Sequence, residues 1–298
     1  MNRRELLLGL IVAPLIGCTS SPEIQSTSTP TTETQAHQTD RPCAGSAANN
    51  AVRRRVSIVP QFSATTIHAA YWPVLTKIGE KANLCFELIL QPSIPEFEDA
   101  LRSNKADYAF MNPYHQVMFR SSYRPLLRDK KKLLTGILVT NRDSTIKTVR
   151  DLEGRDLLLP APNAFAASLL TRAFLDKQGV KVKPRYVKTH QNVYRGVARD
   201  RDAAGGGVNK TYQRESKALQ SEVKILAETP GYPAHPFSAS RSIPPEETTT
   251  VQTLWIEMAQ QPALQPLLKK VQIPFPMRAD YQKDYAPLAE LGLERFVE

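Results

Sequence analysis

Short apolar runs alternate with helical patterns through the first half of the chain. Runs of strand length lie at residues 56–60, 85–90 and 107–111. Between them apolar residues recur every three or four positions, most clearly at 67–81, and a fourth apolar run follows at 133–140. Strands that alternate with helices in this way are typical of an α/β fold with parallel strands.

A second series of the same kind begins at residue 156. The apolar run 156–159 ends at Pro160 and Pro162, and a helical pattern begins behind Asn163. This order predicts a strand, a tight turn and a helix with Asn163 as its N-cap. The first backbone N–H groups of such a helix lack partners at the positive end of its dipole, so the turn is a candidate oxyanion site. The later pattern predicts strands at 185–189, 203–208 and 223–227 and a helix at 190–199.

The last part of the chain returns to the first series. A proline-rich stretch follows residue 229, and helical patterns lie near 246–259 and 286–291. Two α/β lobes joined by two crossings predict a hinged binding protein whose ligand lies between the lobes, at the strand ends. We expect lobe 1 to contain residues 53–140 and 230–298 and lobe 2 to contain residues 141–229.

The N-terminus carries a targeting pattern. Arg3 and Arg4 precede an apolar run at residues 6–16, which is shorter than the roughly 20 residues that span a bilayer. The run closes with Leu-Ile-Gly and Cys18, which resembles the bacterial lipobox. This resemblance implies a lipoprotein signal peptide at residues 1–17 and a lipid on the Cys18 sulfur; a plain secretory signal is the alternative.

Residues 18–52 are rich in Ser, Thr, Pro, Gln and Asn, and almost no large apolar residue is present. Such a segment cannot bury enough surface to offset its ordering entropy, so we expect a disordered tether. Cys43 and Cys85 either form a disulfide between tether and domain or remain as two free thiols. The cysteines show no metal-ligand spacing, and we expect neither a metal nor a cofactor.

Charge and motifs narrow the function classes. Lys and Arg outnumber Asp and Glu by 39 to 29, which suits an anionic partner. The basic residues are dispersed and accompany no nucleic-acid-binding motif, so nucleic acid is not an expected partner. The run Gly205 to Thr211 lacks the earlier glycine of a phosphate loop, and its glycines instead predict close backbone approach. The chain has no Gly-x-Ser-x-Gly elbow, and we expect no enzymatic activity.

Several short motifs, taken together in order, resemble one known family. From residue 56 to residue 298 the chain is similar to the phosphate/phosphite/phosphonate-binding solute receptors of bacterial ABC transporters. That resemblance implies a type II periplasmic binding protein fold with two hinge crossings and mixed sheets flanked by helices. It is carried by Val59-Pro60-Gln61, Trp72-Pro73, the segment 106–114, Asp143-Ser144, the segments 151–154 and 162–166, His190 and the segment 202–208 before Thr211.

The resemblance also implies the ligand contacts. Phosphoryl oxygens would lie on the helix start at Asn163, Ala164, Phe165 and Ala166, with His190 as a further donor. Many members of the family have Ser and Thr hydroxyls at this helix start, and this chain has none there.

Four further positions complete the expected site. Gln61 and Tyr114 follow first-lobe strands and would cover the ligand on closure, with a packing or turn role as the alternative. Members that bind aminophosphonates have acidic residues where this chain has Asn209 and His235, which favours a plain anion. We expect His68 and His115 to be surface or packing residues.

We therefore expect a solute-binding lipoprotein on the periplasmic side of the cell envelope, held to a membrane through Cys18. It would bind a phosphonate, phosphite or phosphate oxyanion and deliver it to an ABC permease. Two alternatives remain open: a ligand-sensing module for a membrane histidine kinase, and a lipoprotein with a degenerate cleft.

Overall fold

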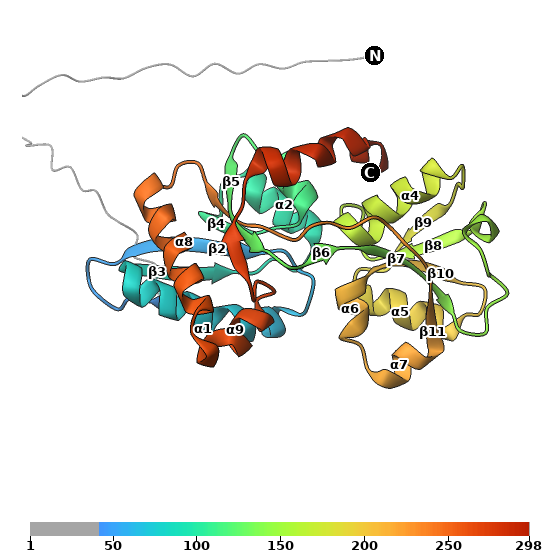
Figure 1. Ribbon diagram of the computed structural model, residues 1–298, viewed down its shortest axis with the longest axis horizontal. Coiled ribbons are helices and arrows are strands. Elements are labelled where there is room, and N and C mark those ends of the chain that lie inside the picture. The colour runs from blue at the N-terminus through green and yellow to red at the C-terminus, as the bar shows by residue number, and fades with distance from the viewer. Residues whose placement is uncertain (1–41, 298) are drawn as a thin grey trace, which may run out of the picture. The chain divides into compact units, whose positions relative to one another are not determined.

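The computed structural model describes residues 42–297 (Figure 1). The predicted signal peptide, Cys18 and the tether as far as residue 41 lie outside the described residues, so these assignments stay predictions. Within the described part, none of the helices has the length and apolar character needed to cross a membrane.

The first sheet has seven strands and mixes parallel with antiparallel pairing. Its centre follows the predicted alternation: β2 (Val52–Ile58) pairs in parallel with β3 (Leu84–Ile89) and with β4 (Tyr108–Phe110). The antiparallel strands were not predicted, because they are short or contain proline. These are β1 (Ala44–Gly45) beside β3, and β13 (Phe237–Ser240), β5 (Tyr123–Asp129) and β14 (Pro276–Arg278) beyond β4.

The second sheet has five strands, and the sequence predicted each of them to within three residues at either end. Its central strand pairs antiparallel with one neighbour and parallel with the other. In sheet order the strands are β11 (Val223–Glu228), β7 (Gly136–Asn141), β10 (Ala204–Val208), β8 (Asp156–Leu159) and β9 (Lys183–Tyr186).

Two short strands form the crossings between the lobes. β6 (Leu133–Leu134) pairs antiparallel with β12 (Tyr232–Pro233) in a two-stranded sheet of their own. The run predicted as one strand at 133–140 is therefore two strands, and its second part, β7, pairs in the second sheet. The first crossing lies before Gly136, which is earlier than the lobe boundary expected after residue 140.

Helices flank both sheets, as the fold class requires (Figure 1). Side-chain caps mark several of their starts: the hydroxyl of Ser63 accepts from the N–H of Thr66, and that of Thr189 accepts from the N–H of Asn192. On the first lobe lie α1 (Ala64–Ala82), α2 (Ile94–Arg102), α3 (Pro113–Met118), α8 (Pro245–Ala259) and α9 (Gln265–Lys270). On the second lie α4 (Thr171–Lys177), α5 (His190–Arg199), α6 (Asn209–Gln213) and α7 (Lys217–Glu222). Shorter 3-10 and π-helical turns lie at Val149–Leu152, Pro262–Leu264, Phe165–Leu170, Tyr281–Tyr285, Ala286–Leu291 and Leu293–Phe296.

The ordered body begins earlier than the expected end of the tether. Cys43 forms a disulfide with Cys85 across 42 positions of sequence, with 5.3 Å between the two Cα atoms. The next residues, β1, pair with β3. The disulfide alternative is thus the one that this structure adopts, and the bond joins the end of the tether to the edge of the first sheet.

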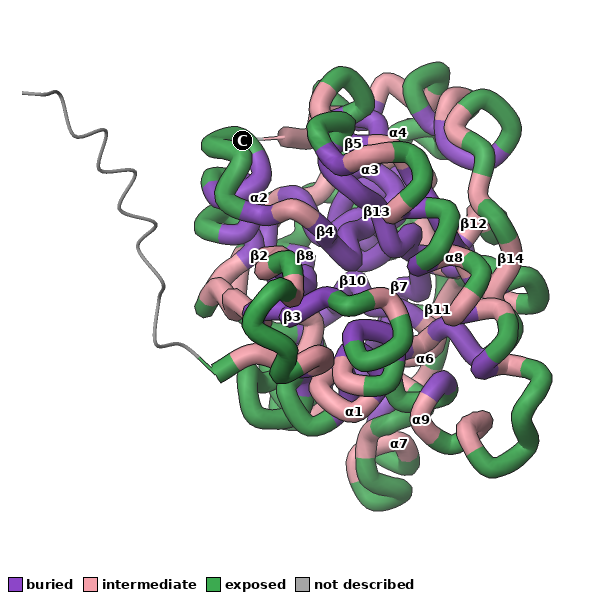
Figure 2. Tube along the Cα trace, turned by 90° about the vertical axis from the view of Figure 1, so that its left-hand side faces the viewer, coloured by how far each residue is buried: buried purple, intermediate pink, exposed green. Residues whose placement is uncertain are grey.

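Buried residues concentrate on the central strands of both lobes (Figure 2). The largest buried cluster contains strands of the first lobe together with the start of the helix behind β8, including Phe165, Leu169 and Leu170. This helix start therefore packs against both lobes.

Candidate functional site

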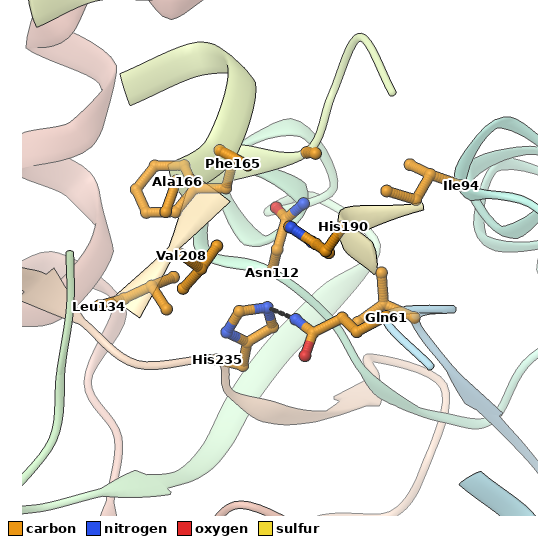
Figure 3. A pocket seen from close by; sticks show the side chains of 12 residues that line it. Gln61, Ile94, Asn112, Leu134, Phe165, Ala166, His190, Val208 and His235 are labelled. Atoms are coloured by element: carbon orange, nitrogen blue, oxygen red, sulfur yellow. Dashed lines mark hydrogen bonds between the residues drawn. The ribbon is translucent and has the colours of Figure 1, made fainter. Parts of the chain in front are cut away.

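A small cavity lies where the helix start of the second lobe meets the first lobe (Figure 3). Its volume is about 20 Å³, close to the space that one water-sized sphere occupies. None of its lining residues is acidic. They are Val59, Gln61, Ile94, Asn112, Leu134, Ala164, Phe165, Ala166, Ala167, His190, Val208 and His235.

One wall is the start of the predicted helix behind β8. The helix begins with a π-helical turn, Phe165–Leu170, which continues directly into α4. Within the described part of the chain, no hydrogen bond uses the backbone N–H groups of Phe165, Ala166 or Ala167. Three amide donors at a helix start thus lie beside the cavity, where an anion is favoured.

The predicted N-cap role of Asn163 is wrong. The cap position is Ala164, without a side-chain hydrogen bond. The amide nitrogen of Asn163 instead donates to both carboxylate oxygens of Glu98, at 2.9 Å each. The carboxylate thus holds the side chain through its nitrogen, and Oδ1, the atom that a cap would use, has no hydrogen-bond partner in the described part of the chain.

Two glycines let this helix start lie directly on the second sheet. A Cβ atom at Gly206 would lie 2.0 Å from the carbonyl oxygen of Ala167, and one at Gly136 would lie 2.3 Å from that of Ala166. No side chain fits at either distance. The glycine run of β10 thus allows close backbone approach, as predicted. This approach fixes how near to the sheet the three free amides of the helix start lie.

His190 supplies a side-chain donor at the opposite wall. It begins α5, as predicted, and only 9% of its surface is exposed. Its Nδ1 atom has no hydrogen-bond partner in the described part of the chain. Burial lowers the pKa of His190 to about 4, so the ring is neutral near pH 7 and has one N–H to donate.

His235 is held in one orientation and one tautomer. Its ring stacks on that of Phe110, with 5.3 Å between the ring centroids. Gln272 donates to Oε1 of Gln61 at 3.0 Å, which directs the Gln61 amide N–H toward Nε2 of His235. Because Nε2 accepts this hydrogen bond, the ring proton lies on Nδ1.

The basic groups at and near the cavity have lowered pKa values. Burial lowers the pKa of His235 well below its usual value, and the neighbouring bases Lys210, His115 and His190 lower it further, because a proton on any of them disfavours a second positive charge. Burial also lowers the pKa of Lys210 to about 8, with a further contribution from Lys132. A bound anion would relieve each of these effects, because it stabilises the protonated form of every base nearby.

The depressed pKa of His190 predicts a loss of stability in acid. Between pH 6.5 and 4 the unfolded chain binds a proton that the folded chain does not, so stability falls as pH falls through this window and is constant above it. We expect His190 to contribute a loss of about 2 kcal/mol between pH 7.5 and 5. Urea unfolding at both pH values should show a smaller loss for His190→Gln than for the unmodified chain. The exposed His68 is the control, and an equal loss in the His190 and His68 variants would contradict the prediction.

Three predicted site residues lie outside the cavity lining. Tyr114 is buried in the core of the first lobe, and Asn163 faces Glu98. Asn209 begins α6, where its side-chain oxygen accepts from the N–H of Lys210. Gln61, Ala164, Phe165, Ala166, His190 and His235 do come together at the cavity.

Sequence reasoning missed half of the lining. Asn112 lies in one of the family-like segments, where its polar side chain after a strand could have indicated a site. The other missed residues are apolar or alanine and resemble ordinary core positions. They are Val59, Ile94, Leu134, Ala167 and Val208.

A buried polar network joins the two lobes beside the cavity. Glu98 on α2 accepts from Asn163 of the second lobe and contacts Nε2 of His115 at 2.8 Å. Asn112 donates to the carbonyl oxygen of Asn163 at 2.9 Å. His115, predicted as a surface or packing residue, is fully buried within this network. The turn before the helix start is thus held by first-lobe side chains.

Among residues 42–297, no three or more His, Cys, Asp or Glu side chains lie close enough together to hold a metal ion.

Comparisons with known proteins show the family and the fold of this chain. A family model described as "ABC transporter, phosphonate, periplasmic substrate-binding protein" matches residues 56–285. A binding protein component of an ABC phosphonate transporter from Pseudomonas aeruginosa has a TM-score of 0.73 at 14% identity, over 83% of this chain and 88% of that chain. PhnD1 from Prochlorococcus marinus, in complex with methylphosphonate, has a TM-score of 0.70 at 14% identity, over 83% of this chain and 99% of that chain. A Xanthomonas citri protein bound to a chloride ion has a TM-score of 0.67 at 16% identity, over 82% and 98%. At these identities the solved structures support the two-lobed fold.

Proposed function

Because this chain belongs to the family of periplasmic substrate-binding proteins of phosphonate ABC transporters, we propose that it binds a phosphonate, phosphite or phosphate ion in the cavity between its lobes. Members of the family are solute receptors rather than enzymes, and they work with a membrane permease. The ligand itself and the residues that hold it are the subject of the proposal.

The observation that supports the proposal best is the set of free donors at one cavity. The three N–H groups of Phe165, Ala166 and Ala167 lack partners, and Nδ1 of the buried His190 lacks one too. Buried polar groups normally have hydrogen bonds, so a cluster of free ones indicates a ligand. A tetrahedral oxyanion has enough acceptor oxygens to satisfy them all.

The lining also indicates which oxyanion fits. Its polar side chains are those of Gln61, Asn112, His190 and His235, and no carboxylate lies among them to hold an ammonium group. Apolar contacts from Ile94, Leu134 and Val208 suit a small carbon substituent. Inorganic phosphate, phosphite and methylphosphonate are therefore the ligands to try first.

Binding would use charge-assisted hydrogen bonds in a site that excludes water. Such bonds are about twice as strong as those between neutral groups. The His235 ring, fixed by Gln61, would present its Nδ1 proton without further ordering, which lowers the entropic cost of binding. Closure of the lobes would complete the site, because the donors come from both of them.

Calorimetry with methylphosphonate, phosphite, phosphate and sulfate tests the proposal. We expect at least one of the three phosphorus oxyanions to bind, and His190→Ala to weaken binding by about 10- to 100-fold, the usual effect of losing a hydrogen bond to a charged group. The control is His68→Ala on the outer side of α1, which should bind as the unmodified chain does. Absence of heat with every anion would refute the proposal.

We also propose that Cys18 carries a lipid and that the segment before Cys43 links it to the folded body. The support is the lipobox-like sequence together with the disulfide that fastens the end of this segment to the first sheet. Expressed in a bacterium, the full chain should partition into the detergent phase of Triton X-114, and Cys18→Ala should remain in the aqueous phase. Equal partitioning of both chains would contradict a lipid on Cys18.

A further inference from the structure

A large groove adjoins the small cavity. Its volume is about 970 Å³, and residues of both lobes line it. Gln61, Ile94 and His190 line both spaces, so the groove opens beside the cavity. The cavity, at about 20 Å³, is the much smaller space, so only the anionic head group of a ligand could lie against its amides, whereas the groove has room for a substituent attached to that head.

The charged side chains of the groove are mostly basic. Lys188, Arg214 and Glu215 line it, all from the second lobe. The carboxylate of Glu215 already accepts a hydrogen bond from Nε2 of Gln191, at 3.2 Å. Arg214 and Lys188 have no carboxylate partner among the described residues.

Arg214 is held in place from the opposite lobe. Its guanidinium lies 4.7 Å from the ring centroid of Phe62, which belongs to the first lobe. A cation–π contact orients the guanidinium but leaves its N–H groups free for an anion. Arg214 thus lies in the groove as an oriented and available cation.

Lys188 has an unusual backbone. Its φ is +75°, a left-handed value that a residue with a side chain rarely adopts. Residues held in this way cluster at ligand sites, where the surrounding structure offsets the strain. Here the conformation lies two residues before His190, between β9 and α5.

Resting on the proposed function, we infer that the preferred ligand is a phosphonate whose carbon substituent ends in a second anionic group, with the head in the cavity and the tail beside Arg214. The buried, unpartnered Nδ1 of His190 lies where the two spaces meet. An ammonium tail would meet Arg214 and Lys188 and would find only Glu215 to pair with. The groove therefore selects against the aminoalkyl substituent and for the carboxyalkyl one.

Calorimetry with three probes tests this inference: methylphosphonate, which has no tail, and phosphonoacetate and 2-aminoethylphosphonate, whose tails are of similar length and opposite charge. We expect phosphonoacetate to bind about 5- to 10-fold more tightly than methylphosphonate, and the amine to bind more weakly than both. Arg214→Gln should remove most of the preference for phosphonoacetate and leave the methylphosphonate affinity within about twofold, since methylphosphonate does not reach the groove. Arg214→Lys should retain the preference for phosphonoacetate. The control is Lys177→Gln at an exposed position of α4, which removes the same charge outside the groove and should leave the preference unchanged.

The possible results separate this inference from the proposed function. If methylphosphonate binds and phosphonoacetate binds no more tightly, the inference is wrong and the proposed function stands. If Arg214→Gln weakens all three probes by the same factor, Arg214 acts only on lobe closure through Phe62, and the inference is again wrong. If none of the three binds, both this inference and the assignment of a phosphonate fail.

Discussion

Replacing Glu98 by alanine should lower the free energy of unfolding by about 3 kcal/mol or more. The Glu98 side chain is buried and accepts hydrogen bonds from Asn163 and His115. Its removal leaves the buried amide nitrogen of Asn163 without a partner, which costs about 1–3 kcal/mol, opens a cavity, and leaves Nε2 of His115 with only the amide of Asn112 at 3.2 Å.

The measurement is urea unfolding of Glu98→Ala, Glu98→Gln and a control. Glutamine keeps the volume, but its NH2 group cannot accept from the amide of Asn163, so we expect a smaller loss than for alanine. The control is Asp99→Ala, which removes the neighbouring carboxylate from an exposed ion pair with Arg102 and should change stability by less than about 0.5 kcal/mol. Equal effects at positions 98 and 99 would show that the interlobe network does not stabilise the fold.

Glu98→Ala should also weaken anion binding, because Asn163 connects Glu98 to the turn that carries the free amides. The lobes would lose a buried contact that favours their closed arrangement. A variant that unfolds more easily yet binds phosphorus oxyanions with unchanged affinity would confine the network to a stabilising role.

A second large effect is expected for Gly206→Ala. The added Cβ would lie 2.0 Å from the carbonyl oxygen of Ala167 and 2.6 Å from Cδ2 of Leu159. A backbone carbonyl cannot rotate away, so the helix start must move away from the sheet. Overpacking of this kind costs about 3 kcal/mol, and the shift would also displace the amides of Ala166 and Ala167 from the cavity.

The matched control is Gly196→Ala in α5 of the same lobe. There the added Cβ would meet only the end of the Leu158 side chain, which can turn aside, and alanine favours the helix by about 1 kcal/mol. Unfolding and calorimetry of both variants provide the comparison. If Gly206→Ala is as stable as Gly196→Ala and binds anions as well, the close approach of the helix to β10 is not required.

The case of Asn163 separates local from long-range information. The sequence correctly placed a strand, a turn and a helix around it, because apolar periodicity and proline act over a few residues. It could not reveal that the Asn163 side chain turns to Glu98, which lies 65 positions earlier in the chain. The local pattern predicted Asn163 as the N-cap, but its side chain binds the buried carboxylate of Glu98 from the other lobe.

The sequence by itself determined the order of strands and helices, the two α/β series, the family resemblance and the position of the helix start behind β8. Each of these depends on patterns within a short window or on motifs in a fixed order. Only the tertiary structure decided the antiparallel strands, the Cys43–Cys85 bond and the convergence of His190 with the free amides. Folding also brings Gln61 to Gln272, which lies 211 positions away in the chain. It places apolar residues that resemble ordinary core positions on the wall of the cavity. Such choices follow from packing between distant segments, and one apolar side chain on a strand resembles another until the chain has folded.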